Sequence, residues 1–359
     1  MVRRHRGLVN QIVEVSKKPV EIKDEYSKDR LISTGSTLLN LALSDSPDGG
    51  FSMGKMVNIV GDSNSGKTLL ALGICAEMAK YKRFDKHRFI FDDVEAASEF
   101  DLRKMFGASV ASRIEPPSVD VEGGFKYSDT IQDFQLNISR ALANEIPFVW
   151  ILDSFDAMTS EEAIGRLQDR LKGKEIGGSY RMDKPKIISE TLSMVIRDIK
   201  KSDSLLIIVS QTRDNINPMS FEKKTRSGGR ALKFYATHEM WMAVGEKFKS
   251  RDRIIGVESK VKVTKNKLTG KVRHISFPIY YDYGIDDIGS CIDFMVEEGF
   301  WRISKQTIDA IDLELKGTRQ YLINQIEENN LEVKLKKAVA SSWKSIEDSL
   351  KLKRKPKYS

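Results

Sequence analysis

Eight consecutive residues of this 359-residue chain have the types and spacing of a phosphate-binding loop. The loop follows the apolar run 56–60, expected to be a strand, and precedes a helix expected over 69–80. Glycines in such a loop let backbone N–H groups converge on phosphate oxygens, and the helix presents its positive end to the same anion. The lysine adds a positive charge, and the threonine hydroxyl can bind Mg²⁺. The predicted loop consists of Gly61, Asp62, Ser63, Asn64, Ser65, Gly66, Lys67 and Thr68.

Hydrolysis of a bound nucleoside triphosphate needs further polar groups. Asp153 ends an expected buried strand and is the predicted carboxylate for Mg²⁺, because ligands of such sheets bind beyond that edge. Glu95 follows a strand that ends at Asp92 and Asp93, where it can polarise the attacking water. Gln211 ends another strand and leads into a long loop, which predicts a sensor of the γ-phosphate. The alternative is that these three residues only cap helices at strand ends.

Strands and helices alternate around these residues. Continuous apolar strands separated by helices are typical of a parallel sheet that is covered on both faces. We therefore predict an α/β fold with a mainly parallel twisted sheet flanked by helices. Later segments alternate more between apolar and polar residues and predict antiparallel strands that finish the sheet. The expected strands are 87–92, 147–153, 205–211, 239–244, 259–264 and 274–281, and the expected helices are 99–106, 130–144 and 186–201.

Two long polar stretches, about 160–185 and 212–229, interrupt this alternation. Long loops without secondary structure are uncommon inside a compact domain and are often functional, although mobile surface is the alternative. Beyond residue 300 the composition shifts to heavily charged and helical over 306–350, with Trp301 and Trp343 as expected anchors. The expected division is an N-terminal oligomerisation arm (1–33), an ATPase core (34–299) and a small helical C-terminal domain with a basic tail (300–359).

Composition excludes several classes of protein. The only two cysteines lie far apart, which excludes a disulfide scaffold and fits a reducing compartment. The four histidines lack the spacing of metal ligands. No apolar run has the length of a membrane span, and the basic N-terminus lacks the apolar stretch of a signal peptide. We expect a cytoplasmic protein with no membrane partner, and the net charge of +8 is compatible with a nucleic-acid partner.

Further motifs show that the chain resembles the bacterial RecA recombinases and their phage UvsX relatives. The resemblance runs in one order from about residue 30 to 300 and continues weakly into 317–329. The phosphate loop is shared by many NTPase families, whereas the glycine-glycine run at 228–236 and the Lys-Asn-Lys run are far more specific. The motifs are 32–36, 61–68, 93–95, 205–213, 228–236 and 261–267.

This resemblance implies a RecA-type P-loop ATPase core. It implies a DNA-dependent ATPase that forms helical filaments on single-stranded DNA and exchanges strands with homologous double-stranded DNA. ATP and Mg²⁺ would lie between adjacent protomers, with Lys265 and Lys267 reaching the γ-phosphate of the neighbour. Glu95 matches the water-activating glutamate and Gln211 the nucleotide-sensing glutamine. The N-terminal arm would dock on the next subunit and build a head-to-tail filament.

The two polar stretches match the two DNA-binding loops of the family. An apolar side chain of the second loop is expected to wedge between bases, and its arginines and glycines are expected to contact the DNA backbone. The expected DNA-binding residues are Arg181, Met182, Arg213, Ile216, Arg226, Ser227, Gly228, Gly229 and Arg230.

The chain departs from the family pattern in three places. Leu102 stands where a tyrosine usually stacks on adenine, the first loop region is longer than usual, and the tail is basic rather than acidic. This divergence favours a phage-encoded version. Two alternatives are a hexameric motor on the same core, and an annealing or regulatory DNA-binding protein with weak turnover. Lysines rather than arginines at the trans position argue against the first alternative, and the set Lys67, Glu95 and Asp153 argues against the second.

Overall fold

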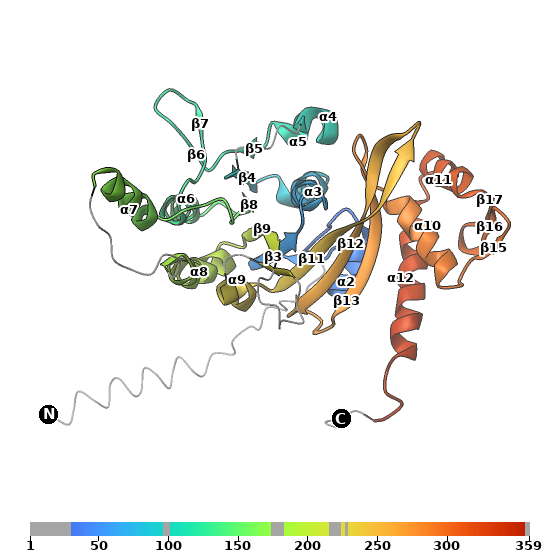
Figure 1. Cartoon of the computed structure of the whole chain (residues 1–359). Helices are drawn as coiled ribbons and strands as arrows, with labels where there is room; N and C mark the ends of the chain where they lie inside the picture. Colours follow the sequence, from blue (N-terminus) through green and yellow to red (C-terminus); the bar gives the residue numbers. More distant parts are fainter. Residues whose placement is uncertain (1–29, 96–100, 174–182, 215–223, 227–228, 356–359) are drawn as a thin grey trace.

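A computed structural model describes residues 30–95, 101–173, 183–214, 224–226 and 229–355. Its centre is a ten-stranded sheet in the order β14-β13-β12-β11-β3-β9-β8-β4-β5, with β10 paired to β9 (Figure 1). Within this order, β11, β3, β9, β8, β4 and β5 are each parallel to the next strand. The pairs β11–β12, β12–β13 and β13–β14 are antiparallel. The predicted mixed sheet is therefore confirmed. The parallel strands are β3 (Lys55–Gly61), β4 (Arg88–Asp93), β5 (Ile114–Glu115), β8 (Phe148–Asp153) and β9 (Leu205–Asp214).

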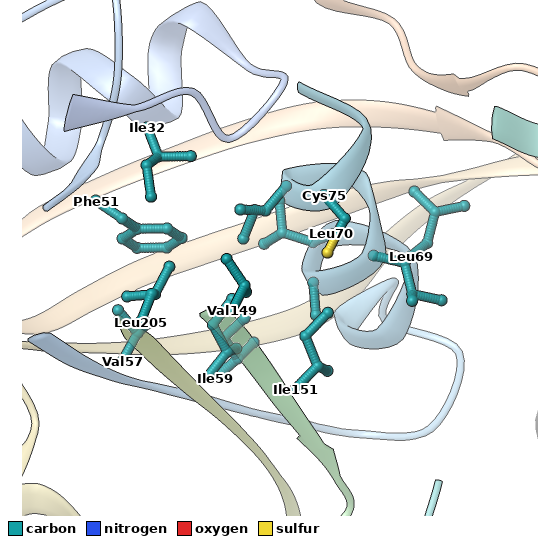
Figure 2. Packing of buried hydrophobic residues seen from close by; sticks show 14 of the residues in the cluster. Ile32, Phe51, Val57, Ile59, Leu69, Leu70, Cys75, Val149, Ile151 and Leu205 are labelled. Atoms are coloured by element: carbon teal, nitrogen blue, oxygen red, sulfur yellow. The ribbon is translucent and has the colours of Figure 1, made fainter. Parts of the chain in front are cut away.

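The parallel strands are apolar throughout because both of their faces are covered. Successive side chains of a strand point to opposite faces. In β8, Val149 and Ile151 therefore join one core cluster, whereas Trp150 and Leu152 join the other. Figure 2 shows the first cluster, in which Phe51 lies beside Val57 and Leu205 of the strands. Leu70 and Cys75 belong to the helix that follows the phosphate loop.

Helices cover the two faces of the sheet. The first core cluster includes residues of α2 (Thr37–Ser44) and α3 (Lys67–Ala79), and the second includes residues of α6 (Ile131–Ala143), α8 (Asp183–Lys201) and α9 (Gly229–Tyr235). The helix expected over 130–144 is confirmed, and it begins with a reciprocal capping box between Thr130 and Asp133. The smaller elements are β1 (Leu31–Ile32), β2 (Phe51–Ser52), η2 (Lys82–Phe84), α4 (Leu102–Phe106), α5 (Ala108–Ala111), β6 (Ser118–Val119) and β7 (Phe125–Lys126).

The antiparallel part of the sheet is longer than predicted. Strands β11 (His238–Ser250) and β12 (Arg253–Asn266) form a hairpin that extends beyond the expected segments. Its two turn residues, Arg251 and Asp252, both have positive φ, at 47° and 61°, as a tight two-residue hairpin turn requires. The sheet then ends with β13 (Arg273–Tyr280) and β14 (Gly284–Ile285).

Both predicted long loops contain regular structure, so their expected extent was wrong. Helix α7 (Glu161–Leu171) occupies much of 160–185, and α8 begins at Asp183. The apolar spacing of Ile164, Leu167 and Leu171 is helical but is hidden in a stretch that is polar on average. In the second stretch β9 continues to Asp214 and pairs with β10 (Lys224–Arg226) as an antiparallel hairpin.

The segment expected to be helical over 306–350 is only partly helical. A three-stranded sheet, made of β15 (Arg302–Ser304), β16 (Thr307–Ala310) and β17 (Leu315–Gly317) with the 3-10 turn η3 (Ile311–Leu313), precedes α11 (Arg319–Glu328) and α12 (Glu332–Ser349). Short strands in a charged segment have little alternation to reveal them. A third core cluster joins α11 and α12 to α2 and to α10 (Asp287–Glu297), so it crosses the expected boundary at residue 300. Trp301 is buried in it and Trp343 packs against it, as predicted.

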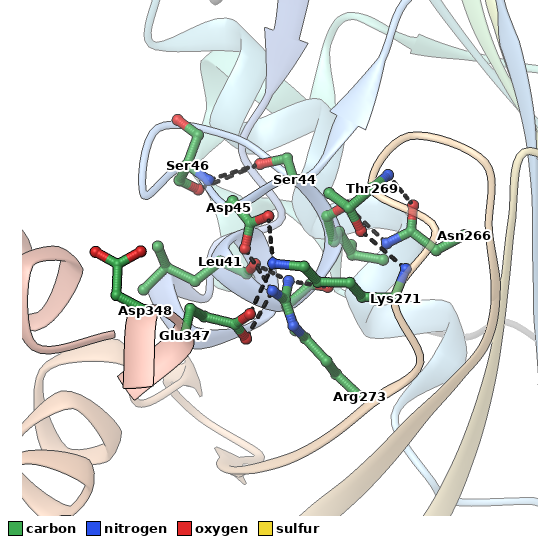
Figure 3. A network of polar contacts seen from close by, with 12 residues as sticks. Leu41, Ser44, Asp45, Ser46, Asn266, Thr269, Lys271, Arg273, Glu347 and Asp348 are labelled. Atoms are coloured by element: carbon green, nitrogen blue, oxygen red, sulfur yellow. Dashed lines mark hydrogen bonds and ion pairs between the residues drawn. The ribbon is translucent and has the colours of Figure 1, made fainter. Parts of the chain in front are cut away.

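A network of ion pairs, which we call the clamp, attaches α12 to the core (Figure 3). It consists of Asp45, Lys271, Arg273 and Glu347. Arg273 is 8% exposed and lies 2.5 Å from Asp45 and 2.7 Å from Glu347, and Lys271 lies 2.7 Å from Glu347. The Arg273 guanidinium also donates to the carbonyl oxygens of Leu41 and Ala42 at the end of α2.

In the described part of the chain, no helix combines the length and the apolar character that crossing a membrane requires.

Candidate functional site

The phosphate loop connects β3 to α3, and its shape depends on glycine. Gly66 has a φ of +88°, and a Cβ at this position would lie 2.4 Å from Cδ1 of Ile279. The loop is also held from β12, which lies two strands from β3, because Ser259 Oγ donates to the carbonyl oxygen of Ser65 at 2.7 Å. Ser65 Oγ in turn donates to the carbonyl oxygen of Asp62 at 2.8 Å. The backbone thus already forms a curved loop at the N-terminus of α3, which is where an anion binds favourably.

Lys67 is the first residue of α3 and is 8% exposed. Its ammonium group donates to the carbonyl oxygen of Asp62 at 2.6 Å. Burial lowers the pKa of Lys67, although Asp153 and Glu95 oppose this shift. A buried cation whose hydrogen-bond acceptor is a neutral carbonyl can exchange that acceptor for a phosphate oxygen, which fits the predicted role.

Thr68 and Asp153 meet beside the loop, as predicted for a metal site. Thr68 Oγ1 donates to Asp153 Oδ2 at 2.5 Å. Burial raises the pKa of Asp153 to about 6, and the negative charges of Glu95 and Asp93 add to the effect. Among the described residues no cluster of three or more histidine, cysteine, aspartate or glutamate side chains could hold a metal unaided. One hydroxyl and one carboxylate oxygen fit Mg²⁺, which proteins usually bind through one or two carboxylates together with substrate phosphates.

Glu95, which follows β4, and Gln211, in β9, touch at the same edge of the sheet. Gln211 Nε2 donates to Glu95 Oε1 at 2.5 Å. Ser154 Oγ donates to the same carboxylate oxygen. Because β4, β8 and β9 are parallel neighbours, their carboxyl ends meet there. The structure therefore brings together the predicted set Lys67, Thr68, Asp153, Glu95 and Gln211.

Sequence analysis missed several residues that position this set. Asp156 Oδ2 accepts from the backbone N–H of Gln211 at 2.6 Å, and Thr212 Oγ1 donates to Asp62 Oδ1. The ammonium group of Lys184, on α8, donates to the carbonyl oxygens of residues 155, 156 and 158 and so holds the segment after β8. The available signal was that polar residues follow the apolar runs of β8 and β9, at the edge where parallel strands place their ligands.

Lys265 and Lys267 lie away from the phosphate loop of their own chain. Lys265 pairs with Glu239 of β11, which is level with Asn58 in the middle of β3, and the backbone N–H of Lys267 donates to Thr237 beside the amino end of β3. Both ammonium groups donate to the carbonyl oxygen of Phe234 at the end of α9, at 2.9 and 3.3 Å. Burial, followed by the charge of Lys267, lowers the pKa of Lys265 to about 8.

Four of the nine expected DNA-binding residues belong to the described structure. Arg213 and Arg226 belong to the β9–β10 hairpin, in which Arg213 pairs with Thr225 and Arg226 with Thr212, and Gly229 and Arg230 begin α9. The other five residues, Arg181, Met182, Ile216, Ser227 and Gly228, lie outside the described residues.

Leu102 occupies the position of the expected adenine-stacking tyrosine. It is the first residue of α4 and packs, partly buried, against the first core cluster. Leucine offers no aromatic face for stacking, so the departure seen in the sequence persists in the structure.

Comparison with known proteins identifies the family. The sequence model described as the RecA N-terminal domain matches residues 18–286. The Protein RecA of Caulobacter vibrioides (strain NA1000 / CB15N) is 30% identical over 269 residues, which cover 75% of this chain and 68% of that protein. The Protein RecA of Brucella canis is 29% identical over 277 residues, which cover 77% of this chain and 70% of that protein. Together with the mixed sheet and its phosphate loop, these matches show that the chain belongs to the RecA family.

Proposed function

We propose that this protein is a DNA-dependent ATPase that forms helical filaments on single-stranded DNA and exchanges strands with homologous double-stranded DNA. Membership of the RecA family supports a role in DNA recombination and repair. The observation that carries the finer proposal is the contact between Glu95 and Gln211. It joins the nucleotide site to Gln211, the residue directly before the segment 212–229, where DNA binding is expected.

The residues of the nucleotide site divide the chemical work. Lys67 and the backbone of the loop bind the phosphates, and Glu95 orients and polarises the attacking water. Thr68 and Asp153 would hold Mg²⁺, which neutralises charge that develops on the phosphate oxygens. Gln211 leaves Glu95 for the γ-phosphate or its water. This exchange moves the residue directly before the DNA-binding segment when nucleotide binds, an order–disorder type of switch.

The neighbouring protomer completes the site in this proposal. Lys265 is level with the middle of β3 and Lys267 lies near its amino end, whereas the phosphate loop follows its carboxyl end. This separation supports a role of both lysines toward another chain. Cations near the transferred phosphoryl group stabilise the transition state, and supplying them in trans couples turnover to assembly. Head-to-tail contacts that do not close produce a helical filament.

The test is an ATPase assay with and without single-stranded DNA, followed by electron microscopy of the same sample. Strong stimulation together with helical filaments supports the proposal. Closed rings would support a hexameric motor, and slow turnover indifferent to DNA would support an annealing or regulatory protein. Binding should tolerate sequence changes and weaken steeply with salt, because most contacts are expected to be with phosphates.

A mixing experiment tests the trans arrangement. Lys67→Ala removes one half of the composite site, and the double variant Lys265→Ala/Lys267→Ala removes the other half. Each variant alone is expected to lack turnover. A mixture should regain part of it, because an intact Lys67 then meets intact lysines across some interfaces. If the mixture stays inactive while both variants still assemble, the trans role is wrong.

A further inference from the structure

We propose that Asp62 and Thr212 are positioning residues that couple the phosphate loop to the segment 212–229, as a link separate from Glu95 and Gln211. The inference rests on the proposed function, since it concerns how nucleotide binding alters DNA binding. Thr212 Oγ1 donates to Asp62 Oδ1 across the ends of two strands.

The register of the sheet places this pair side by side. Strands β3 and β9 are parallel neighbours, and their last paired residues are Gly61 and Gln211. Asp62 and Thr212 are therefore the next residue of each chain segment beyond the paired ends. Asp62 belongs to the phosphate loop, and Thr212 begins the segment expected to bind DNA, so one hydrogen bond joins the two.

Asp62 is connected to the nucleotide site through its backbone as well. Its carbonyl oxygen accepts from the ammonium group of Lys67 at 2.6 Å and from Ser65 Oγ at 2.8 Å. When phosphates bind, Lys67 is expected to exchange this carbonyl for a phosphate oxygen, and negative charge arrives near the Asp62 carboxylate. Asp62 thus loses the hydrogen bond from Lys67 to its carbonyl oxygen, and its carboxylate is repelled by the phosphates while it accepts from Thr212.

The root of the DNA-binding segment is held from its other side too. The backbone N–H of Gln211 donates to Asp156 Oδ2 at 2.6 Å, so β9 is held at Gln211 and Thr212 between a carboxylate beyond β3 and one beyond β8. Neither contact uses the Gln211 side chain. A ligand shifts a conformational equilibrium only through interactions that differ between its two states. The partner exchange of Lys67 beside Asp62 is such a difference, and Thr212 is the residue that carries it to the next segment.

Coupling is measured as the ratio of the Kd for single-stranded DNA without nucleotide to that with a non-hydrolysable ATP analogue and Mg²⁺, at one fixed salt concentration. Thr212→Val keeps the size of the side chain and removes the hydroxyl. It is expected to reduce the ratio about five-fold, the change that corresponds to one hydrogen bond of ~1 kcal/mol. Thr212→Ser keeps the hydroxyl and should retain the wild-type ratio.

Two further variants separate the hydrogen bond from the charge. Asp62→Asn keeps an acceptor oxygen for Thr212 and should retain most of the coupling, whereas Asp62→Ala should lose it as Thr212→Val does. The nucleotide Kd with and without DNA must change by the same factor, because coupling is reciprocal. If Thr212→Val does not fold, which its thermal unfolding curve would show, Asp62→Ala against Asp62→Asn provides the same comparison.

The outcomes distinguish this inference from the proposed function. A wild-type ratio of one would overturn the nucleotide-to-DNA switch and the inference with it. A wild-type ratio well above one that Thr212→Val and Asp62→Ala leave unchanged would overturn the inference alone. A ratio that falls equally in Thr212→Val and Thr212→Ser would also overturn it, because the hydroxyl would then not be responsible.

Discussion

The nucleotide site and the clamp are two polar clusters built from distant parts of the chain, and they differ in charge balance. In the clamp, Arg273 and Lys271 face two carboxylates, and the guanidinium also donates to backbone carbonyls. At the nucleotide site, Lys67 faces the carboxylates of Asp153, Glu95, Asp62 and Asp156.

The difference is the one expected between a structural cluster and a ligand-binding one. The charges of the clamp are paired within the chain, whereas at the candidate nucleotide site burial raises the pKa of Asp153 and the negative charges of Glu95 and Asp93 add to the effect. Among the described residues, carboxylates therefore outnumber cations at the candidate nucleotide site. Mg²⁺ and the lysines of a neighbouring protomer would supply positive charge in the proposed filament.

The largest expected effect comes from removing a charge from the candidate nucleotide site. Glu95→Gln should lower ATP turnover ~10²–10⁴-fold, because an amide cannot accept the proton of the attacking water. The change should not lower the thermal unfolding midpoint, since it relieves repulsion between carboxylates. Phosphate release and calorimetry measure the two effects. The matched control is Glu122→Gln, at an exposed turn, which should leave turnover unchanged. Turnover near the wild-type level in Glu95→Gln would remove Glu95 from the chemistry.

Removing a charge from the clamp should lower the stability of the fold rather than ATP turnover. Arg273→Met leaves Asp45 and Glu347 without the buried guanidinium and is expected to destabilise the fold by ~3 kcal/mol. Urea denaturation measures the loss. An unfolding midpoint equal to that of the wild type would show that the clamp is not structural.

A buried titratable group without a countercharge gives an intermediate case. Neither ring nitrogen of His238 has a hydrogen-bond partner among the described residues, and burial lowers its pKa to about 4. The unfolded chain binds a proton near pH 6.5 that the folded chain does not, so stability falls as pH drops from 6.5 toward 4. Between pH 7.5 and 5 the loss should be ~2 kcal/mol. Denaturation of His238→Leu at both pH values should show a correspondingly smaller loss, and an equal loss would locate the pH dependence elsewhere.

The smallest effect is expected at an exposed ion pair. Lys104 on α4 lies 2.7 Å from Asp282 after β13, and both side chains are mostly exposed. Solvent and salt screen such pairs, so Lys104→Ala should not measurably change the unfolding midpoint. A loss of stability comparable to that of Arg273→Met would mean that burial does not explain why the ion pairs of the clamp stabilise the fold more than an exposed pair.

The local pattern of the sequence predicted the sheet and five residues that the structure brings together at the candidate nucleotide site. Parallel strands with two buried faces read as continuous apolar runs, and their carboxyl ends must meet at one edge, so Asp153, Glu95 and Gln211 could be placed from their strands alone. Helix α7, β10 and the strands β15–β17 could not be predicted as well, because polar composition hides short regular elements.

The sequence by itself determined which chemical groups the protein has and which edge of the sheet presents them, because strand periodicity and the phosphate-loop spacing are local properties of the chain. Only the tertiary structure decided which of these groups touch. The register of β3 against β9 brings Asp62 to Thr212, and the packing of α2 against both α12 and β13 brings Glu347 to Arg273. Such pairs depend on the relative positions of segments far apart in the chain, and no local pattern encodes a contact between two surfaces that only folding brings together.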